Sequence, residues 1–421
     1  MKHSDYDSSP VNRKLLAGFS IVILLGFPRQ LCGYSVLTHE AIIDTLWIDT
    51  IQPVLLMRFP TASGEQLREA HAYAHGGCLI QDLGYYPFGS HFFSDLTHYV
   101  RSADFLTALL DESRDLNEYA FALGAVAHYG ADIDGHSIAV NRAVPLLYPK
   151  LRRIFGSEIT YADNPQAHLK TEFGFDVLQV ARGHYAPAAY HDFIGFQVSK
   201  DLLDRAFQKT YGLTLKDIFR TLDLALGTYH FSVSIILPKM TKTAWAIKNK
   251  EIMNEQPTMS RKLFIYNVKR ASFEKEWGKD YEHPGFGTHL LALVFRLMPK
   301  FGPFKGLAFR VPTPDIERMF EDSFDAAITR DRRSFAQAEA GGLRIPNRDL
   351  DTGRPVSSGE YLLTDRTYDK LLTQLAEKSF EGVTPELRQN ILNFYTQMKT
   401  PDQHGIGPQL TALKNFAKPG N

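Results

Sequence analysis

The sequence of 421 residues has very little cysteine, with only Cys32 and Cys78 present. Two cysteines allow at most one internal disulfide, and none remains if processing removes the segment that carries Cys32. A disulfide framework is therefore excluded as the main source of stability, which must come from a hydrophobic core and bound ligands.

The chain also lacks an excess of either charge, because Lys and Arg total 47 and Asp and Glu also total 47. A formal net charge of zero gives no global field that would draw the protein onto nucleic acid or an anionic membrane. Any attraction to phosphate must be local. The hydrophobic content of 44% is ordinary for a globular protein, and a chain of this length can form a substantial core.

The amino-terminal segment has the pattern of a secretory signal. Arg13 and Lys14 precede an apolar run over 15–27, which is followed by the small residue Gly33. The run is shorter than the ~20 residues of a membrane-spanning helix. We therefore expect 1–33 to be a signal peptide that is removed on export, which leaves a secreted or periplasmic protein. Without cleavage, the same segment would be an N-terminal membrane anchor.

Helical spacing of apolar residues recurs along the chain, whereas no segment alternates at period two over several strands. The predicted helices span 35–57, 65–75, 103–110, 116–136, 166–180, 200–209, 215–226, 230–247, 289–297, 316–326 and 368–398. Gly76 and Gly77 are expected to end the second helix, and 82–95 and 340–360 to form loops, the latter exposed. The pattern predicts an all-α protein.

Two of these helices carry histidine and carboxylate residues at four-residue spacing. His128, Asp132 and His136 share one helix face, with about 5–6 Å between neighbouring Cβ atoms, and His168 and Glu172 repeat the spacing. Nitrogen and carboxylate ligands without thiolates suit Zn²⁺, whereas Ca²⁺ prefers oxygen ligands. Because both sets lie among apolar residues, where charges need partners, we predict a zinc site.

The same segments resemble the zinc-dependent phospholipase C family. Residues 167–178 are similar to its second metal motif. The spacing of His128, Asp132 and His136 resembles the branch with glycosylphosphatidylinositol-specific phospholipase D, since bacterial phospholipases C have two more residues before the last histidine. The resemblance covers about 34–178 and implies an all-α, multi-helix bundle like that of phospholipase C and P1 nuclease.

The resemblance divides the chain into three parts and implies up to three zinc ions. The signal peptide is followed by a catalytic region, 34–195, and by a helical C-terminal extension, 196–421, of unknown role. The implied metal ligands are Tyr34, through the free amine and carbonyl that cleavage would create, His39, Asp82, His91, His128, Asp132, His136, His168 and Glu172. His98 is the alternative to His91, which is preferred for its adjoining Ser and Phe residues. His71 and His75 are left open between a role in the site and an ordinary helix face.

The family implies that a zinc-activated water hydrolyses a phosphodiester bond, with a phospholipid as the expected substrate. Asp82 would orient or deprotonate that water. The residues expected to line an apolar mouth for the substrate are Tyr85, Tyr86, Phe88 and Phe92. Residues 290–310 mix apolar and basic side chains and are a candidate for peripheral membrane contact, although a core helix and loop is the preferred interpretation.

Three other functions remain open at this point. A glycosylphosphatidylinositol-phospholipase D-like activity would break the bond on the other side of phosphorus. A secreted nuclease like S1 and P1 would use the same zinc ions, but nucleic acid binding favours aromatic platforms in a basic groove, and the balanced charge argues against one. A non-catalytic exported metal-binding protein is the third.

Overall fold

The structure, a computed structural model, describes residues 36–182, 196–233, 237–255, 260–262, 309–396 and 405–416. Within these ranges the expectation of an all-α protein is confirmed, because the only β-type pairing is an isolated antiparallel bridge between Arg348 and Pro355. No helix in the described ranges is long and apolar enough to cross a membrane. The proposed signal peptide, Tyr34 and most of 290–310 lie outside the described residues.

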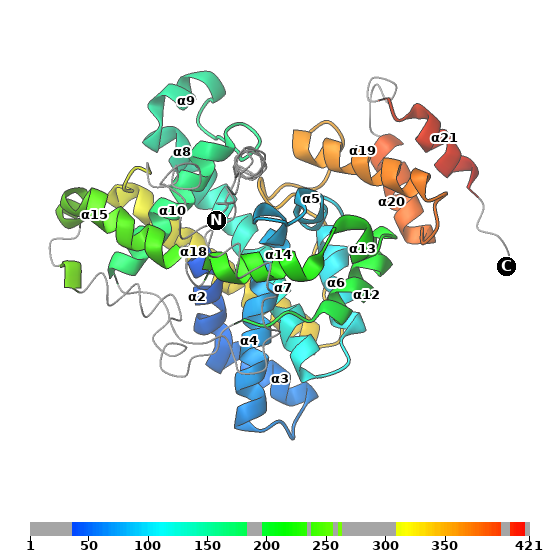
Figure 1. Cartoon of the computed structure of the whole chain (residues 1–421), viewed down its shortest axis with the longest axis horizontal. Helices are drawn as coiled ribbons and strands as arrows, with labels where there is room; N and C mark the ends of the chain where they lie inside the picture. The colour runs from blue at the N-terminus through cyan, green and yellow to red at the C-terminus, as the bar shows by residue number, and fades with distance from the viewer. Residues whose placement is uncertain are drawn as a thin grey trace, which may run out of the picture.

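The helical elements follow one another along the chain as shown in Figure 1. They are α2 (Val36–Leu46), the π-helical η1 (Trp47–Ile51), α3 (Gln52–Arg58), α4 (Gly64–Ile80), the 3₁₀ turn η2 (Gln81–Tyr85), α5 (His91–Tyr99), α6 (Ser102–Glu112), α7 (Leu116–Asp134), the π-helical η3 (Gly135–Val140), α8 (Asn141–Leu147), α9 (Pro149–Phe155), α10 (Pro165–Arg182), α12 (Lys200–Tyr211), α13 (Leu215–Ile218), α14 (Leu222–Phe231), α15 (Leu237–Glu255), α18 (Pro314–Glu339), α19 (Leu362–Glu377), α20 (Pro385–Thr396) and α21 (Gly407–Asn415).

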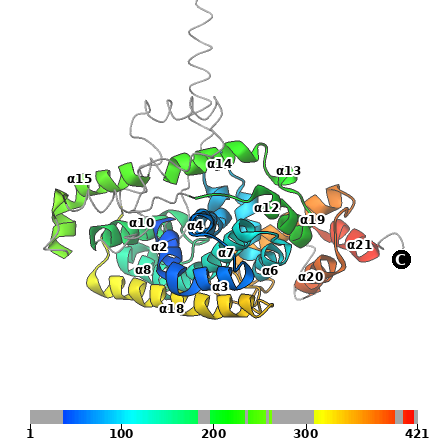
Figure 2. The ribbon, with the colours of Figure 1, turned by 90° about the horizontal axis from the view of Figure 1, so that it is seen from below.

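Helix α7 is the central element, and every residue from Glu118 to Asp134 is buried. Its first turn is capped by Asp115, whose side chain accepts a hydrogen bond from the Glu118 N–H at 2.8 Å. Figure 2 shows α18 along one side of the molecule and α14 and α15 along the opposite side, with α4 and α7 between them. A helix surrounded in this way must be apolar on all faces, so its few polar residues need specific partners.

Helices α4 and α7 approach each other closely because each has a glycine at the contact. A Cβ atom at Gly77 would lie 1.9 Å from the carbonyl oxygen of Phe121, and one at Gly124 would lie 2.0 Å from that of Ala74. The expectation that glycine ends the second helix is therefore wrong, since α4 continues to Ile80. The glycines provide close packing within the helix and do not terminate it.

The carboxy-terminal segments share the hydrophobic core of the amino-terminal ones, which extends from Val36 to Leu413. Helix α18 packs along α7, and Arg330 donates to both oxygens of Asp134 at 2.7 and 2.8 Å. The predicted helix 368–398 is split between α19 and α20, and the predicted helix 230–247 covers the end of α14 and the first part of α15. At 340–360 the prediction of an exposed loop is wrong at its centre, because the stretch 349–351 is buried.

Candidate metal centre

Five buried side chains from four elements meet at the centre of the molecule. Helix α2 supplies His39, η2 supplies Asp82, α5 supplies His98, and α7 supplies His128 and Asp132. They form two groups that could hold a metal ion, His39–His128–Asp132 and Asp82–His98–His128. Within each group the ligand atoms all lie within 4.8 Å of one another. His128 belongs to both groups, so the groups adjoin.

Asp132 lies between the imidazoles of this cluster. Its Oδ1 atom is 3.4 Å from Nε2 of His39, and its Oδ2 atom is 3.1 Å from Nε2 of both His98 and His128. The Asp82 carboxylate faces the same histidines, at 3.5 Å from His98 and 4.0 Å from His39. One carboxylate with an oxygen toward each group has the placement that a bridging ligand needs.

The turn that carries Asp82 is held by Ser94 of the following helix. The Ser94 hydroxyl accepts a hydrogen bond from the Gly84 N–H at 2.9 Å and donates to the carbonyl oxygen of Gln81. A Cβ atom at Gly84 would lie 2.1 Å from the carbonyl oxygen of Ser90. Within 82–95, the 3₁₀ turn η2 and the start of α5 flank a short turn over 86–90, so the loop expected from its composition is confirmed only for those residues.

Backbone carbonyl groups set the orientation of three histidine rings. The Nδ1 atom of His98 lies 2.7 Å from the Ser94 oxygen, that of His128 lies 2.9 Å from the Cys78 oxygen, and that of His136 lies 3.1 Å from the Leu350 oxygen. A carbonyl oxygen only accepts hydrogen bonds, so each Nδ1 carries the proton. Nε2 is then the ring nitrogen that can bind a metal. Metal-binding histidines usually donate a hydrogen bond from their other ring nitrogen in this way.

The carboxylates of this region lack the hydrogen bonds that buried charges require. Both oxygens of Asp82, Asp132 and Glu172 are buried and accept no hydrogen bond of proper geometry. Burial opposes protonation of His98, but the close negative carboxylates of Asp132 and Asp82 outweigh it and raise the pKa of this histidine to about 10. Burial raises the pKa of Asp82. A divalent cation would satisfy these oxygens in place of protons.

A third group lies where η3, α10 and the loop before α19 meet. Glu172 Oε1 is 2.9 Å from Nε2 of His168 and 3.3 Å from Nε2 of His136. Asp351 Oδ1 lies 3.9 Å from Nε2 of His168, and His136, His168 and Asp351 form another set that could hold a metal ion. The sequence prediction missed Asp351, because a single aspartate in a polar loop has no partner at helical spacing to mark it.

Asp351 is held rigidly toward this group. It accepts hydrogen bonds from the hydroxyl group of Tyr361 and, at 3.0 Å, from the N–H of Tyr161. Asp349, two residues earlier, accepts a hydrogen bond from the N–H of Asp351 at 2.9 Å and so fixes the turn. Gly353 completes this turn with a φ of +69°. The Oδ1 atom of Asp351 is buried and has no hydrogen-bond partner.

His91 lies outside all of these groups, whereas the alternative, His98, belongs to one of them. Helix α5 begins at His91, and His98 is seven residues further along, or about 10 Å along the helix axis. The His91 ring is partly exposed and packs against Tyr85 with ring centroids 5.6 Å apart. The adjoining Ser90 and Phe92 lie at the start of this helix.

Among the four aromatic residues expected to line a mouth, Tyr85 adjoins the cluster. Its ring lies edge-on to His98 with centroids 5.9 Å apart, and 6.2 Å from Tyr161, which in turn lies 5.7 Å from His168. Tyr86 packs on Tyr229, Phe92 is buried near Lys370, and Phe88 is 48% exposed. Tyr161 was not singled out in the sequence.

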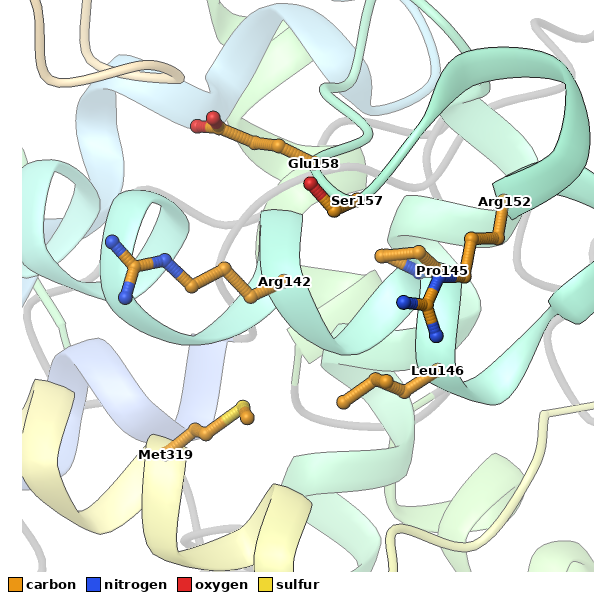
Figure 3. Close-up of a pocket in the computed structure, with 7 residues that line it drawn as sticks. All are labelled: Arg142, Pro145, Leu146, Arg152, Ser157, Glu158 and Met319. Carbon is orange, nitrogen blue, oxygen red and sulfur yellow. The ribbon is translucent and has the colours of Figure 1, made fainter.

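A separate cavity of about 300 Å³ lies among α8, α9 and α18. Figure 3 shows its lining residues, Arg142, Pro145, Leu146, Arg152, Ser157, Glu158 and Met319. None of them belongs to the metal-binding groups, so this cavity is not the candidate centre.

Comparison with models of known protein families identifies a match within the chain. Residues 38–220 match a family model described as zinc dependent phospholipase C. No curated protein and no solved structure matches the chain. The matched range contains every residue of the two adjoining groups, whereas Asp351 lies beyond it.

Proposed function

Because residues 38–220 belong to the zinc-dependent phospholipase C family, we propose that this protein hydrolyses a phosphodiester bond of a phospholipid at the cluster around Asp132. The observation that carries the proposal is the set of buried carboxylate oxygens without hydrogen bonds, on Asp82, Asp132 and Glu172. They face the Nε2 atoms of histidines, and this donor set fits zinc.

Three ions would use the three groups. The first would be held by His39 and Asp132, with the amine and carbonyl of Tyr34 if cleavage precedes it; the second by Asp82, His98, His128 and Asp132; and the third by His136, His168, Glu172 and Asp351. The number of ions is part of the proposal. The proposal also changes the expected ligand set in two ways, since His98 replaces His91 and Asp351 is added.

Bound zinc supplies Lewis acidity, since it polarises a phosphoryl oxygen and lowers the pKa of a coordinated water from 15.7 to about 7. Residues of the chain would orient the attacking water and hold the substrate next to the zinc ions. Asp82 has both oxygens buried within the cluster, and we assign it the orientation and deprotonation of the attacking water. Tyr85 and Tyr161 flank the histidines and are suited to contact the apolar part of the substrate.

The activity test measures zinc content together with hydrolysis of bis-p-nitrophenyl phosphate and phosphatidylcholine. We expect at least two zinc ions per chain and release of phosphocholine, which chelation abolishes. Asp132→Asn should lower the rate at least ~10²-fold, since it weakens two sites at once. Asp331→Asn, a buried aspartate outside all the metal-binding groups, is the matched control and should retain activity.

The other functions correspond to distinct results of the same assay. Release of choline and phosphatidic acid would indicate D-type cleavage. Hydrolysis of single-stranded DNA but not lipid would indicate a nuclease. A protein that retains its zinc and cleaves no phosphodiester would be a metal-binding protein only.

Export and the amine ligand form one linked proposal. Cleavage after Gly33 would place Tyr34 at the amino terminus, only two residues before α2, which carries His39. Sequencing of the mature amino terminus tests this, and any first residue other than Tyr34 removes the proposed amine ligand.

Contact with the lipid surface is proposed at α9. This helix exposes Ile154, which is 71% exposed, and Phe155, beside the exposed basic residues Lys150, Arg152 and Arg153. Apolar side chains surrounded by basic ones favour an anionic membrane surface. The segment that follows α9 carries Tyr161 to the metal centre, so contact at α9 would bring lipid toward the cluster.

A further inference from the structure

A further set of metal-ligand side chains lies between α2 and α4, and none of its members belongs to the ligand set of the proposed function. The set consists of Asp44, His71 and His75, whose ligand atoms lie within 4.8 Å of one another. Nε2 of each histidine lies 3.0 Å from the same carboxylate oxygen, Asp44 Oδ1. All three side chains are less than one-tenth exposed.

The two helices present these residues by simple periodicity. His71 and His75 are four apart on α4 and therefore share one face of that helix. Asp44 lies on α2, which packs against α4. The indole ring of Trp47 stacks on the His71 ring at 3.9 Å between centroids and 4° between planes, which fixes the orientation of this imidazole.

Hydrogen bonds alone do not satisfy all the buried carboxylate oxygens at this set of residues. Two imidazole N–H groups can both donate to Asp44 Oδ1, but Asp44 Oδ2 is then buried without a partner. Glu40 lies one helical turn before Asp44 on the same face of α2, and both of its oxygens are also buried and accept no hydrogen bond. Buried carboxylate oxygens without partners are costly, and a cation offers the missing interaction.

The distances also suit a zinc ion. In a tetrahedral site with bonds of about 2.0–2.1 Å, neighbouring ligand atoms lie about 3.3 Å apart, close to the 3.0 Å between the Asp44 oxygen and each Nε2 atom. Two imidazole nitrogens with a carboxylate oxygen form a ligand set that zinc prefers over Ca²⁺ or Mg²⁺.

We propose that Asp44, His71 and His75 bind a structural Zn²⁺ ion, with Glu40 available for the fourth position. This ion would connect α2 to α4 next to the cluster around Asp132. Helix α2 carries His39 of that cluster, and one turn beyond His75 the Cys78 carbonyl oxygen orients His128. The ion would thereby hold two histidines of the proposed catalytic centre in their relative positions.

The decisive experiment uses the wild-type protein as purified with zinc. Anomalous difference density recorded at the zinc edge from crystals of the full chain should show a peak between Asp44, His71 and His75. Its absence, in crystals grown with zinc in excess, overturns the proposal. Peaks at the cluster around Asp132 report separately on the catalytic centre, so the two proposals can fail independently.

A variant pair gives a second measurement in solution. The double variant His71→Gln and His75→Gln should hold one zinc ion fewer per chain than the wild type at saturating zinc, as counted by mass spectrometry of the metal. The matched control is His230→Gln, which replaces a buried histidine outside every metal-binding group that the described residues form. It should retain the wild-type count. An equal count in a folded double variant contradicts the proposal.

Discussion

The role of Asp351 as a zinc ligand can be tested without changing the size of its side chain. Replacement by Asn keeps the size of the side chain and removes the charge that faces His168 at 3.9 Å. We expect Asp351→Asn to lower zinc affinity at the group with His136 by about 10- to 100-fold. Competition with a chelator measures this affinity, and an unchanged value would remove Asp351 from the ligand set.

Asp331 provides a prediction about pH that does not involve the metal-binding groups. Burial raises its pKa well above the ordinary value, and the nearby charge of Asp134 adds to this effect. The folded state therefore holds the proton more tightly than the unfolded state. The resulting stability is present at acidic pH and is lost as pH rises from about 4 toward the raised pKa.

Asp331→Asn removes this loss, because an amide does not ionise. We expect the variant to be more stable than the wild type at pH 7 by about 1–3 kcal/mol, with a difference in melting temperature that shrinks as the pH is lowered. A constant difference across pH 4–8 would show that the carboxyl group is not the cause.

The sequence was sufficient for the ligands that share a helix and insufficient for those brought together by tertiary contacts. His128 and Asp132 are related by one helical turn, so their spacing alone predicts that they adjoin. The choice between His91 and His98 rested on the adjoining Ser and Phe residues, because 82–95 was expected to form a loop and no helix position was available to decide it. Asp351 meets His136 only through a tertiary contact, which has no local signal.

At the scale of elements, the contact between α4 and α7 determines where His128 lies. Gly77→Ala would bring a methyl group to 1.9 Å from the Phe121 carbonyl oxygen and force the helices apart. We expect a loss of at least about 1–3 kcal/mol in unfolding free energy, measured by chemical denaturation. Gly64→Ala is the control in the same helix, since nothing lies within 4 Å of its added Cβ atom. It should be neutral or slightly stabilising.

Helix α9 gives the prediction about membrane contact. The double variant Ile154→Glu and Phe155→Glu should reduce hydrolysis of anionic phospholipid vesicles several-fold, because both exposed apolar side chains become charged. Hydrolysis of soluble bis-p-nitrophenyl phosphate should not change, since neither residue belongs to the metal-binding groups. Equal losses on both substrates would indicate damage to the fold.

For the whole molecule, metal removal should cost stability as well as activity. Each site occupied at 100 times its dissociation constant adds about 2.7 kcal/mol to the folded state. We therefore expect a chelator to lower the melting temperature clearly, and added Zn²⁺ to restore it, whereas Mg²⁺ should not. Calorimetric scans measure both changes, and a melting temperature indifferent to chelation would contradict metal binding in the core.

The fold class was predictable because helical periodicity is a local property of the sequence. The roles of Gly77 and Gly124 were not, since a glycine within a helix and one that ends it look alike until the partner helix is known. The burial of 349–351 was likewise hidden, because a polar loop becomes part of the core only through its contacts with η3 and α10.

The His136 Nδ1 atom rests on the carbonyl oxygen of Leu350, a residue more than two hundred positions later in the chain. During synthesis, the third group is therefore incomplete long after the helices that bear its histidines have emerged. Closing so long a loop is slow compared with forming local helices. A nascent chain would bind its metal ions one after another. The third group would bind its ion last, after the carboxy-terminal part has packed against the rest of the protein.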